Sequence, residues 1–308
     1  MKSFLPYSKQ FLDKSDIKSV VKTLKSNFIT QGPEISNFEK NFSKFTDAKY
    51  SVACATGTAA LHIALKMIDI KENDIVILPI VNFISTTNIL TEMKAKLYFA
   101  DVDPSNGQMT PKTLTECIKK NKLKKVKAFV TMYLGGNCQN NVLFYRLKKK
   151  LKCFMIEDAC HALGTKYISL NKGYYIGSCK HADISTFSLH PVKSITTGEG
   201  GFLTTNKKAL FDKSILFRSH GIVRKNNAHW DYDVKVPGLN YRLSDLNCSL
   251  GISQLKKLDK FTKKRNYIAK KYLEVFKNNK FIELPQALKN IYSSWHLFII
   301  TIDFTRVK

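Results

Sequence analysis

Short apolar segments alternate with amphipathic helical segments along most of this chain, and this alternation is the feature that most restricts its fold. Apolar runs rich in β-branched and aromatic residues are typical of strands, and a helical stretch between two strands can return the chain to a parallel neighbour. The sequence therefore predicts an α/β fold with a mostly parallel central sheet. We expect its strands at residues 50–53, 75–78, 96–100, 126–131, 153–156, 184–187 and 202–204.

The pattern changes near residue 246. Leu255 and Leu258 belong to a long stretch of helical periodicity, which is followed by one further extended segment, residues 295–302. A single strand has little to pair with and is a poor basis for a domain. We therefore expect a large α/β domain over residues 1–245, and residues 246–308 as the start of a small C-terminal domain that is truncated in this chain.

The charge balance is strongly basic, with 50 lysine and arginine residues against 24 acidic ones and a formal net charge of +26. Such a balance is typical of some nucleic-acid-binding proteins. Only six of the basic residues are arginine, however, and the lysines are spread along the chain without interleaved aromatic residues. We interpret the excess as a solvated lysine surface that would attract an anionic small substrate, and we expect no nucleic-acid partner. A basic nucleic-acid-binding protein remains the alternative from a different class.

Seven cysteines are scattered along the chain without a Cys-x-x-Cys pair. This pattern favours free thiols in a reducing compartment over disulfides or a zinc site, so we expect a cytoplasmic protein with no bound metal. We expect no signal peptide, because the first residues contain no apolar core of the required kind. The best apolar run, residues 296–302, is far too short to span a membrane, so no membrane association is expected either.

The loop after the strand predicted at residues 184–187 carries the first chemical signal. It contains Ser188, Lys193 and two threonines, and it ends in Gly198-Glu199-Gly200-Gly201. Glycines let the backbone approach a ligand closely. A lysine that is desolvated there has a lowered pKa and can bond covalently to an aldehyde cofactor. A lone lysine is more often a surface residue, so the loop by itself leaves both interpretations open.

A second signal follows the strand predicted at residues 153–156, where Glu157 and Asp158 precede His161. Ligands of open α/β sheets bind at the carboxyl ends of the strands, where Asp158 is expected. A carboxylate there can hold the ring nitrogen of a pyridoxal cofactor protonated, so that the ring accepts electrons. Asp158 could equally cap the following helix, and His161 could equally be a hydrogen-bonded core residue.

Two further segments follow strand ends. Gly57 and Thr58 are expected at a helix N-terminus, where free backbone N–H groups and a hydroxyl can bind a phosphate. An ordinary capped helix explains them at least equally well, and the segment fits neither the Walker A motif nor Gly-x-Gly-x-x-Gly. Phe83 follows another strand and could stack on a flat ring, although an aromatic residue there is more often part of the core.

Together and in this order, the four segments resemble the DegT/DnrJ/EryC1/StrS family of sugar aminotransferases. The resemblance extends from about Phe4 to the end of the chain and includes Arg218-Ser219-His220-Gly221 and Gly238-Leu239-Asn240-Tyr241-Arg242. It implies a fold-type I transferase that depends on pyridoxal 5'-phosphate (PLP) and is usually a homodimer.

The resemblance also implies roles for individual residues. Lys193 would hold the cofactor aldehyde and then move a proton between substrate and cofactor. Asp158 would pair with the pyridine nitrogen, His161 would lie near the phenolic oxygen, and Phe83 would stack on the ring. The cofactor phosphate would be bound by Gly57, Thr58, Ser188 and, from the other subunit, Asn240. The sugar nucleotide would be bound by Tyr7, Asn27, Phe28, Ile29, Thr30 and Thr56.

The reaction implied is the transfer of an amino group from glutamate to C4 of a UDP-linked 4-keto-6-deoxy-N-acetylhexosamine, a step of pseudaminic acid biosynthesis. Within the family this step is suggested by Thr30-Gln31-Gly32-Pro33, His161-Ala162-Leu163-Gly164 and His190-Pro191-Val192-Lys193. Two alternatives stay open. One is a transaminase for another nucleotide 4-keto sugar, such as the UDP-bacillosamine precursor. The other is a cofactor-binding relative that is inactive through C-terminal truncation.

Overall fold

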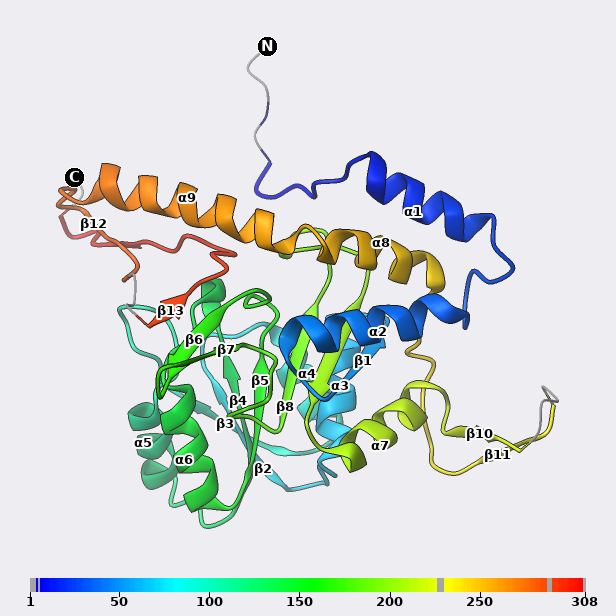
Figure 1. Ribbon diagram of the computed structural model, residues 1–308. Coiled ribbons are helices and arrows are strands. Elements are labelled where there is room, and N and C mark those ends of the chain that lie inside the picture. The colour runs from blue at the N-terminus through cyan, green and yellow to red at the C-terminus, as the bar shows by residue number, and fades with distance from the viewer. Residues whose placement is uncertain (1–3, 5, 226–229, 287–289, 307–308) are drawn as a thin grey trace.

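The computed structural model describes residues 4, 6–225, 230–286 and 290–306, and it has the α/β architecture that the sequence predicts (Figure 1). The strands of its main sheet are β1 (Tyr50–Cys54), β2 (Ile75–Pro79), β3 (Lys96–Ala100), β4 (Val126–Met132), β5 (Phe154–Asp158), β8 (Ile184–Ser188) and β9 (Gly201–Thr205). These seven strands have the order β1-β9-β8-β5-β4-β2-β3. β9 is antiparallel to both of its neighbours, and the other strands are parallel to one another. The prediction of a mostly parallel sheet is therefore confirmed.

Helices cover both faces of this sheet. One face packs against α3 (Gly57–Met67), α4 (Ile84–Glu92) and α7 (Lys208–Arg218), and the other against α2 (Pro33–Thr46), α5 (Pro111–Lys120), α6 (Asn141–Leu151) and α8 (Asp245–Leu255). In β2, Val76 and Leu78 enter the cluster on the first face, whereas Ile77 enters a cluster on the second. This alternation is the period of two that a strand imposes. Because both faces are buried, the strands are continuous apolar runs in the sequence.

The N-terminal helix α1 (Lys14–Leu24) packs on the outer side of α8 (Figure 1). Its start is a capping box, in which the Asp13 and Asp16 side chains each accept a hydrogen bond from the other's backbone. The Lys257 ammonium contacts both carboxylates, at 2.7 Å from Asp13 and 2.6 Å from Asp16. These two ion pairs attach α1 to the segment that follows α8.

The C-terminal part differs from the sequence-based expectation of a single strand, since its described residues form three short strands, at Ile282–Glu283, Ile291–Tyr292 and Thr301–Ile302. The sequence predicts one strand over residues 295–302, but only β14 (Thr301–Ile302) forms there, paired with β12 (Ile282–Glu283). Trp295, the first residue of the predicted strand, has a φ of 46° in the left-handed region, so an extended strand does not begin there. The predicted division of the chain between residues 245 and 246 stays a prediction.

Shorter elements complete the described chain, and none of its helices is both long enough and apolar enough to cross a lipid bilayer. A long helix, α9 (Leu258–Phe276), follows α8. β10 and β11 form a hairpin that projects from the body of the molecule in Figure 1, and β13 pairs with β6, which pairs with β7. The bounds of these strands are β6 (Lys166–Ser169), β7 (Lys172–Tyr175), β10 (Ile222–Arg224), β11 (Tyr232–Val234) and β13 (Ile291–Tyr292).

Candidate active site

A cavity of about 600 Å³ lies at the carboxyl ends of the parallel strands. Residues that follow β1, β2, β4, β5 and β8 line it, because the carboxyl ends of parallel strands meet at one edge of a sheet. The predicted residues in this cavity are Thr56, Gly57, Thr58, Phe83, Asp158, His161, Ser188 and Lys193. The fold thus brings together segments that are far apart in the sequence.

The N-terminus of α3 forms one end of the cavity. Thr56 is the N-cap of this helix, and its Oγ1 accepts a hydrogen bond from the Ala59 N–H at 3.0 Å. The backbone N–H groups of Gly57 and Thr58 stay at the helix N-terminus, where the helix dipole favours an anion. A side chain at position 57 is sterically excluded, since a Cβ there would lie 2.7 Å from the Ser188 Cβ. This end of the cavity fits a phosphate group.

The loop between β8 and β9 carries Lys193 and is fixed by its own backbone hydrogen bonds. The Lys193 N–H donates to the His190 carbonyl at 2.9 Å, and the Leu189 N–H donates to the Gly200 carbonyl at 2.8 Å. The Thr197 N–H also donates to the Leu189 carbonyl, at 3.0 Å. Lys193 is half-buried and lines the cavity, so an aldehyde in the cavity can reach its amine.

Asp158 is buried at the carboxyl end of β5 and lines the same cavity. Its Oδ1 accepts a hydrogen bond from the Cys160 N–H at 3.1 Å. Burial raises the pKa of the Asp158 carboxyl, while the hydrogen bonds from Cys160 and the Lys193 ammonium partly oppose this shift. A buried carboxylate needs a cation to offset its desolvation, and the protonated ring nitrogen of PLP is such a cation.

His161 follows β5 and lines the cavity with an imidazole that stays uncharged. Burial lowers the pKa of His161 to about 3, and the Lys193 ammonium contributes to this shift. The His161 Nδ1 accepts a hydrogen bond from the Gly135 N–H at 3.4 Å. In a neutral imidazole that accepts at Nδ1 the proton is on Nε2, so His161 can donate a hydrogen bond to a ligand oxygen.

Phe83 follows β2 and is the N-cap residue of α4. Its side chain is 67% exposed and lines the cavity beside Val81 and Asn82. The alternative interpretation of Phe83 as a core residue is therefore wrong. An exposed aromatic face at a cavity is free to stack on a flat ring.

Most of the residues predicted to bind the sugar nucleotide lie outside this cavity. Thr56 lines the cavity. The residues that do not line it are exposed: Tyr7, Asn27, Phe28, Ile29 and Thr30. Asn240, predicted to bind the cofactor phosphate, is exposed and outside the cavity as well. The loop that carries residues 27–30 is nevertheless fixed at its end, where the Asp245 carboxylate accepts hydrogen bonds from the Gly32 N–H at 2.8 Å and the Glu34 N–H at 2.9 Å. The roles of the exposed residues stay predictions.

Several lining residues were not singled out by the sequence motifs. They are Leu61, Val81, Asn82, Ser85, Met132, Leu134 and Cys160, whereas His190, Val192 and Glu199, which also line the cavity, belong to the sequence motifs. Met132 is the last residue of β4 and Leu134 follows it, so the strand-end rule that pointed to Asp158 would also have found this segment. The motifs missed it because neither Met132 nor Leu134 carries a titratable or phosphate-binding group.

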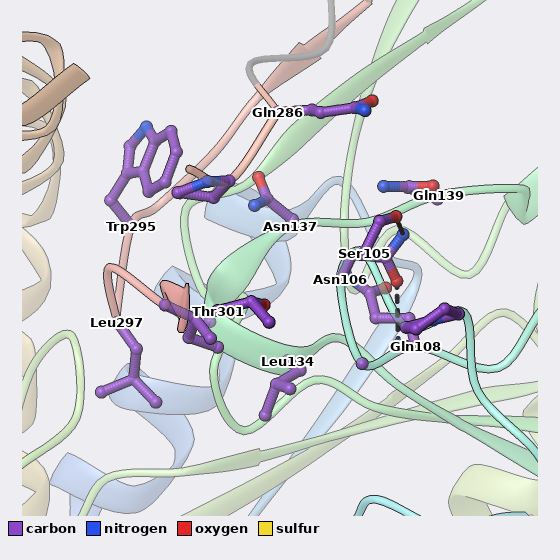
Figure 2. Close-up of a pocket in the computed structure, with 15 residues that line it drawn as sticks. Ser105, Asn106, Gln108, Leu134, Asn137, Gln139, Gln286, Trp295, Leu297 and Thr301 are labelled. Carbon is purple, nitrogen blue, oxygen red and sulfur yellow. Dashed lines mark hydrogen bonds between the residues drawn. The ribbon is translucent and has the colours of Figure 1, made fainter. Parts of the chain in front are cut away.

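A second cavity, of about 160 Å³, lies beside the turn after β4, and Leu134 lines both cavities (Figure 2). It is lined by Asn106, Gln108, Asn137, Gln139, Gln286, Trp295, Leu297 and other uncharged residues of the described chain. Because it has no lysine, carboxylate or imidazole, it does not fit the predicted chemistry. The larger cavity does fit PLP, with a lysine for the aldehyde, a buried carboxylate for the ring nitrogen and a helix N-terminus for the phosphate.

Comparison with known sequences places these features in a family. Residues 10–308 match the DegT/DnrJ/EryC1/StrS aminotransferase family. The chain is 38% identical over 296 residues to the UDP-4-amino-4,6-dideoxy-N-acetyl-beta-L-altrosamine transaminase of Campylobacter jejuni strain 81-176, covering 96% of this chain and 76% of that protein. It is 34% identical over 306 residues to the spore coat polysaccharide biosynthesis protein SpsC of Bacillus subtilis, covering 97% of this chain and 76% of SpsC.

Solved structures agree with the sequence comparison. PseC of Helicobacter pylori, an aminotransferase involved in the biosynthesis of pseudoaminic acid, superposes with a TM-score of 0.89 at 31% identity, covering 98% of this chain and 79% of PseC. The PLP form of Spr1654 from Streptococcus pneumoniae superposes with a TM-score of 0.87 at 26% identity, covering 98% of this chain and 79% of that one. The chain therefore belongs to the DegT/DnrJ/EryC1/StrS family of PLP-dependent sugar aminotransferases and has their fold-type I architecture.

Proposed function

We propose that this aminotransferase moves an amino group from glutamate to C4 of a UDP-linked 4-keto-6-deoxy-N-acetylhexosamine, as a step of pseudaminic acid biosynthesis. The observation that carries the chemistry is the presence of Lys193, Asp158 and His161 around one cavity that also has a phosphate-binding end. The sugar class is supported by the similarity to the altrosamine transaminase of C. jejuni and to PseC of H. pylori.

Each cavity residue has a distinct role in this proposal. When bound, PLP holds the amino group covalently and withdraws electrons from the carbon that bears it. Lys193 binds the aldehyde through Nζ and, when released, moves the proton to and from the reacting carbon. Asp158 keeps the ring nitrogen protonated, and the Nε2–H of His161 donates to an oxygen of the ring. Phe83 covers one face of the ring and excludes water from it.

The remaining predicted residues bind phosphate and substrate. Gly57, Thr58 and Ser188 bind the cofactor phosphate in one subunit, and Asn240 of the other subunit of a homodimer completes the site. The sugar nucleotide is bound by Tyr7, Asn27, Phe28, Ile29, Thr30 and Thr56. The positive charge of the chain favours the approach of this anionic substrate. The cytoplasmic location expected from the scattered cysteines remains part of the proposal.

The first experiment is a visible absorption spectrum of the purified chain with PLP, before and after addition of glutamate. We expect a band of lysine-bound cofactor that glutamate converts to the amine form, and no such band in Lys193→Ala. A folded protein without the band would refute the role of Lys193. A band that glutamate leaves unchanged would favour a cofactor-binding relative without turnover.

A second experiment identifies the sugar. The amine form of the protein is mixed with the UDP-linked 4-keto substrate of the pseudaminic acid pathway or with the UDP-bacillosamine precursor, and return of the lysine-bound band is followed together with product mass. Faster return with the first substrate supports the proposal. Faster return with the second assigns the chain to the alternative transaminase.

A further inference from the structure

The segment of residues 293–297 is attached to the turn that follows β4. The Leu297 N–H donates a hydrogen bond to the Gly135 carbonyl at 3.2 Å, and the Ser293 hydroxyl donates to the Gly136 carbonyl at 3.1 Å. Gly135 also donates its N–H to the His161 Nδ1. One short turn therefore contacts both the C-terminal segment and a cavity-lining imidazole.

The same segment is attached directly to the loop that carries His161. The Ser294 hydroxyl donates to the His161 carbonyl at 2.9 Å, and the Ser294 N–H donates to the Thr165 Oγ1 at 3.0 Å. The chains approach so closely that no side chain fits at position 136, where a Cβ would meet the Ser294 Oγ and lie 2.8 Å from the His161 carbonyl oxygen. Gly136 also has a φ of 94°, which glycine adopts most readily.

The backbone of this segment is strained at Trp295, which has a φ of 46°. A non-glycine residue in the left-handed region costs free energy and persists only where surrounding contacts impose it. Trp295 and Leu297 face the smaller cavity (Figure 2). His296, between them, contacts His161 instead: the two ring centroids are 4.3 Å apart, with 48° between the ring planes.

Two nearby cations affect the pKa values of these imidazoles. Lys193, from the loop between β8 and β9, lowers the pKa of both rings, and Arg265, from α9, lowers the pKa of His296. Burial lowers the pKa of His296 to about 2, with further contributions from His161, Lys193 and Arg265. Since the pKa of His161 is also lowered, to about 3, both rings are neutral at physiological pH. Their contact is therefore a packing contact between uncharged rings.

We propose that His296 is a positioning residue for His161: its ring packs against the His161 imidazole and keeps that imidazole on the Gly135 amide with the Nε2–H available to the cavity. A residue of the C-terminal segment thereby controls a hydrogen-bond donor of the candidate active site. The structural part of this proposal does not depend on the cofactor. Its effect on turnover rests on the proposed function.

The first test uses the cofactor-free protein and needs no turnover. In ¹⁵N-histidine NMR spectra we expect His161 to show the Nε2–H tautomer and no titration between pH 5 and 8 in the wild type and in His296→Phe, which retains a ring. In His296→Ala the tautomers should mix, and the His161 pKa should rise toward its ordinary range because the ring loses part of its cover from solvent. Identical His161 signals in the wild type and His296→Ala would overturn the proposal.

A matched control separates positioning from loss of structure. Leu297→Ala alters the neighbouring residue of the same segment, which faces the smaller cavity, and should leave the His161 signals unchanged. An equal change in Leu297→Ala would show that the segment acts only as a structural support and would refute a specific role of His296. If His296→Ala does not fold, His296→Gln, which has no ring, is measured in its place with the same expected result.

The second test uses the PLP-bound enzyme. We expect His296→Ala to lower kcat about tenfold with little change in KM and to shift the pH titration of the cofactor absorption band. His296→Phe, which retains a ring, should keep both kcat and the titration close to those of the wild type. Altered NMR signals with an unchanged absorption titration would contradict the link from His161 to the cofactor. Altered NMR signals in a protein with no turnover on any keto-sugar would leave the positioning intact and refute the proposed function.

Discussion

The cofactor side and the substrate side of the candidate site are built in different ways. Except for Asn240, the proposed PLP-binding residues line one cavity at the strand ends, the N-terminus of α3 and the loop after β8, where Asp158 and Gly57 are buried and Phe83 is exposed. The proposed sugar-nucleotide residues, such as Tyr7 and Phe28, are 85% and 55% exposed. One chain thus presents a nearly complete cofactor cavity, whereas the substrate side consists of exposed segments. The comparison teaches that cofactor binding and substrate binding can be tested separately.

Substitution of Lys193 should give the largest effect, because it removes the group that bonds to the cofactor. We expect Lys193→Ala to abolish the visible band of lysine-bound PLP and to lower kcat roughly a thousandfold or more. The control is Lys208→Ala, which removes an exposed lysine that pairs with Asp212 on α7 and should change neither. Retention of the band in Lys193→Ala would mean that another amine binds the cofactor.

The variant Gly57→Ala should distinguish cofactor binding from substrate binding most clearly. The Cβ of Gly57→Ala would lie 2.7 Å from the Ser188 Cβ, so we expect PLP affinity to fall roughly ten- to a hundredfold. Gly173→Ala on β7 is the matched control, because a Cβ there meets nothing within 4 Å. The dissociation constants are measured by absorbance titration. Equal affinity in the two variants would show that this helix N-terminus does not bind the phosphate.

The two sides also differ in how well the sequence predicts them. All seven strands of the main sheet were located to within about two residues, since each is a local apolar run between covered faces. Asp158 and Phe83 were found by the same local logic, as residues that follow a strand. The antiparallel direction of β9 leaves no local signal, because it depends on which strands it pairs with.

Features that depend on contacts between distant segments could not be predicted from the sequence. The contact between His161 and His296 joins the end of a central strand to the C-terminal segment, and no periodicity reports it. Of the strand expected over residues 295–302 only Thr301–Ile302 forms, and it pairs with β12, a partner that the local pattern does not report. Trp295, Leu297, Ile299 and Thr301 of that segment line the smaller cavity, and Phe298 packs against Trp295 and Tyr272 of α9.

Substitution of an aromatic residue on the substrate side should weaken substrate binding and leave PLP binding unchanged, the opposite of the effect expected for Gly57→Ala. We expect Phe28→Ala to raise the KM for the sugar nucleotide about tenfold, with the PLP band and its conversion by glutamate unchanged. Phe281→Ala is the control, since Phe281 is 50% exposed but lies beside β12, at the opposite end of the molecule from the loop between α1 and α2 (Figure 1). If Phe28→Ala instead weakens PLP binding, residues 27–30 belong to the cofactor side and the division between the two sides is wrong.

Low pH should destabilise α1, which leads into the substrate-side loop at residues 27–30, more than it destabilises the cofactor side. This is the smallest effect we expect. Burial alone would raise the pKa of Asp16, but hydrogen bonds from Lys257, Ser253 and Gln254 outweigh it and lower the pKa. A lowered carboxyl pKa adds stability above the ordinary value of about 3.9 and loses it as the pH falls through the lower, folded value. The Asp16 carboxylate is buried and the Lys257 side chain is 15% exposed, so solvent screens this ion pair only weakly.

Amide hydrogen exchange measured from pH 7 down to pH 3 tests this anchorage. We expect the opening free energy of α1 to fall below about pH 4 while that of α3 falls less, since α1 is attached to the segment after α8 through Lys257 and α3 is buried in the core. Lys257→Met should weaken the protection of α1 at pH 7 and remove most of its pH dependence. Parallel loss of protection in both helices would mean that α1 and the loop it leads into are as firmly held as the cofactor cavity.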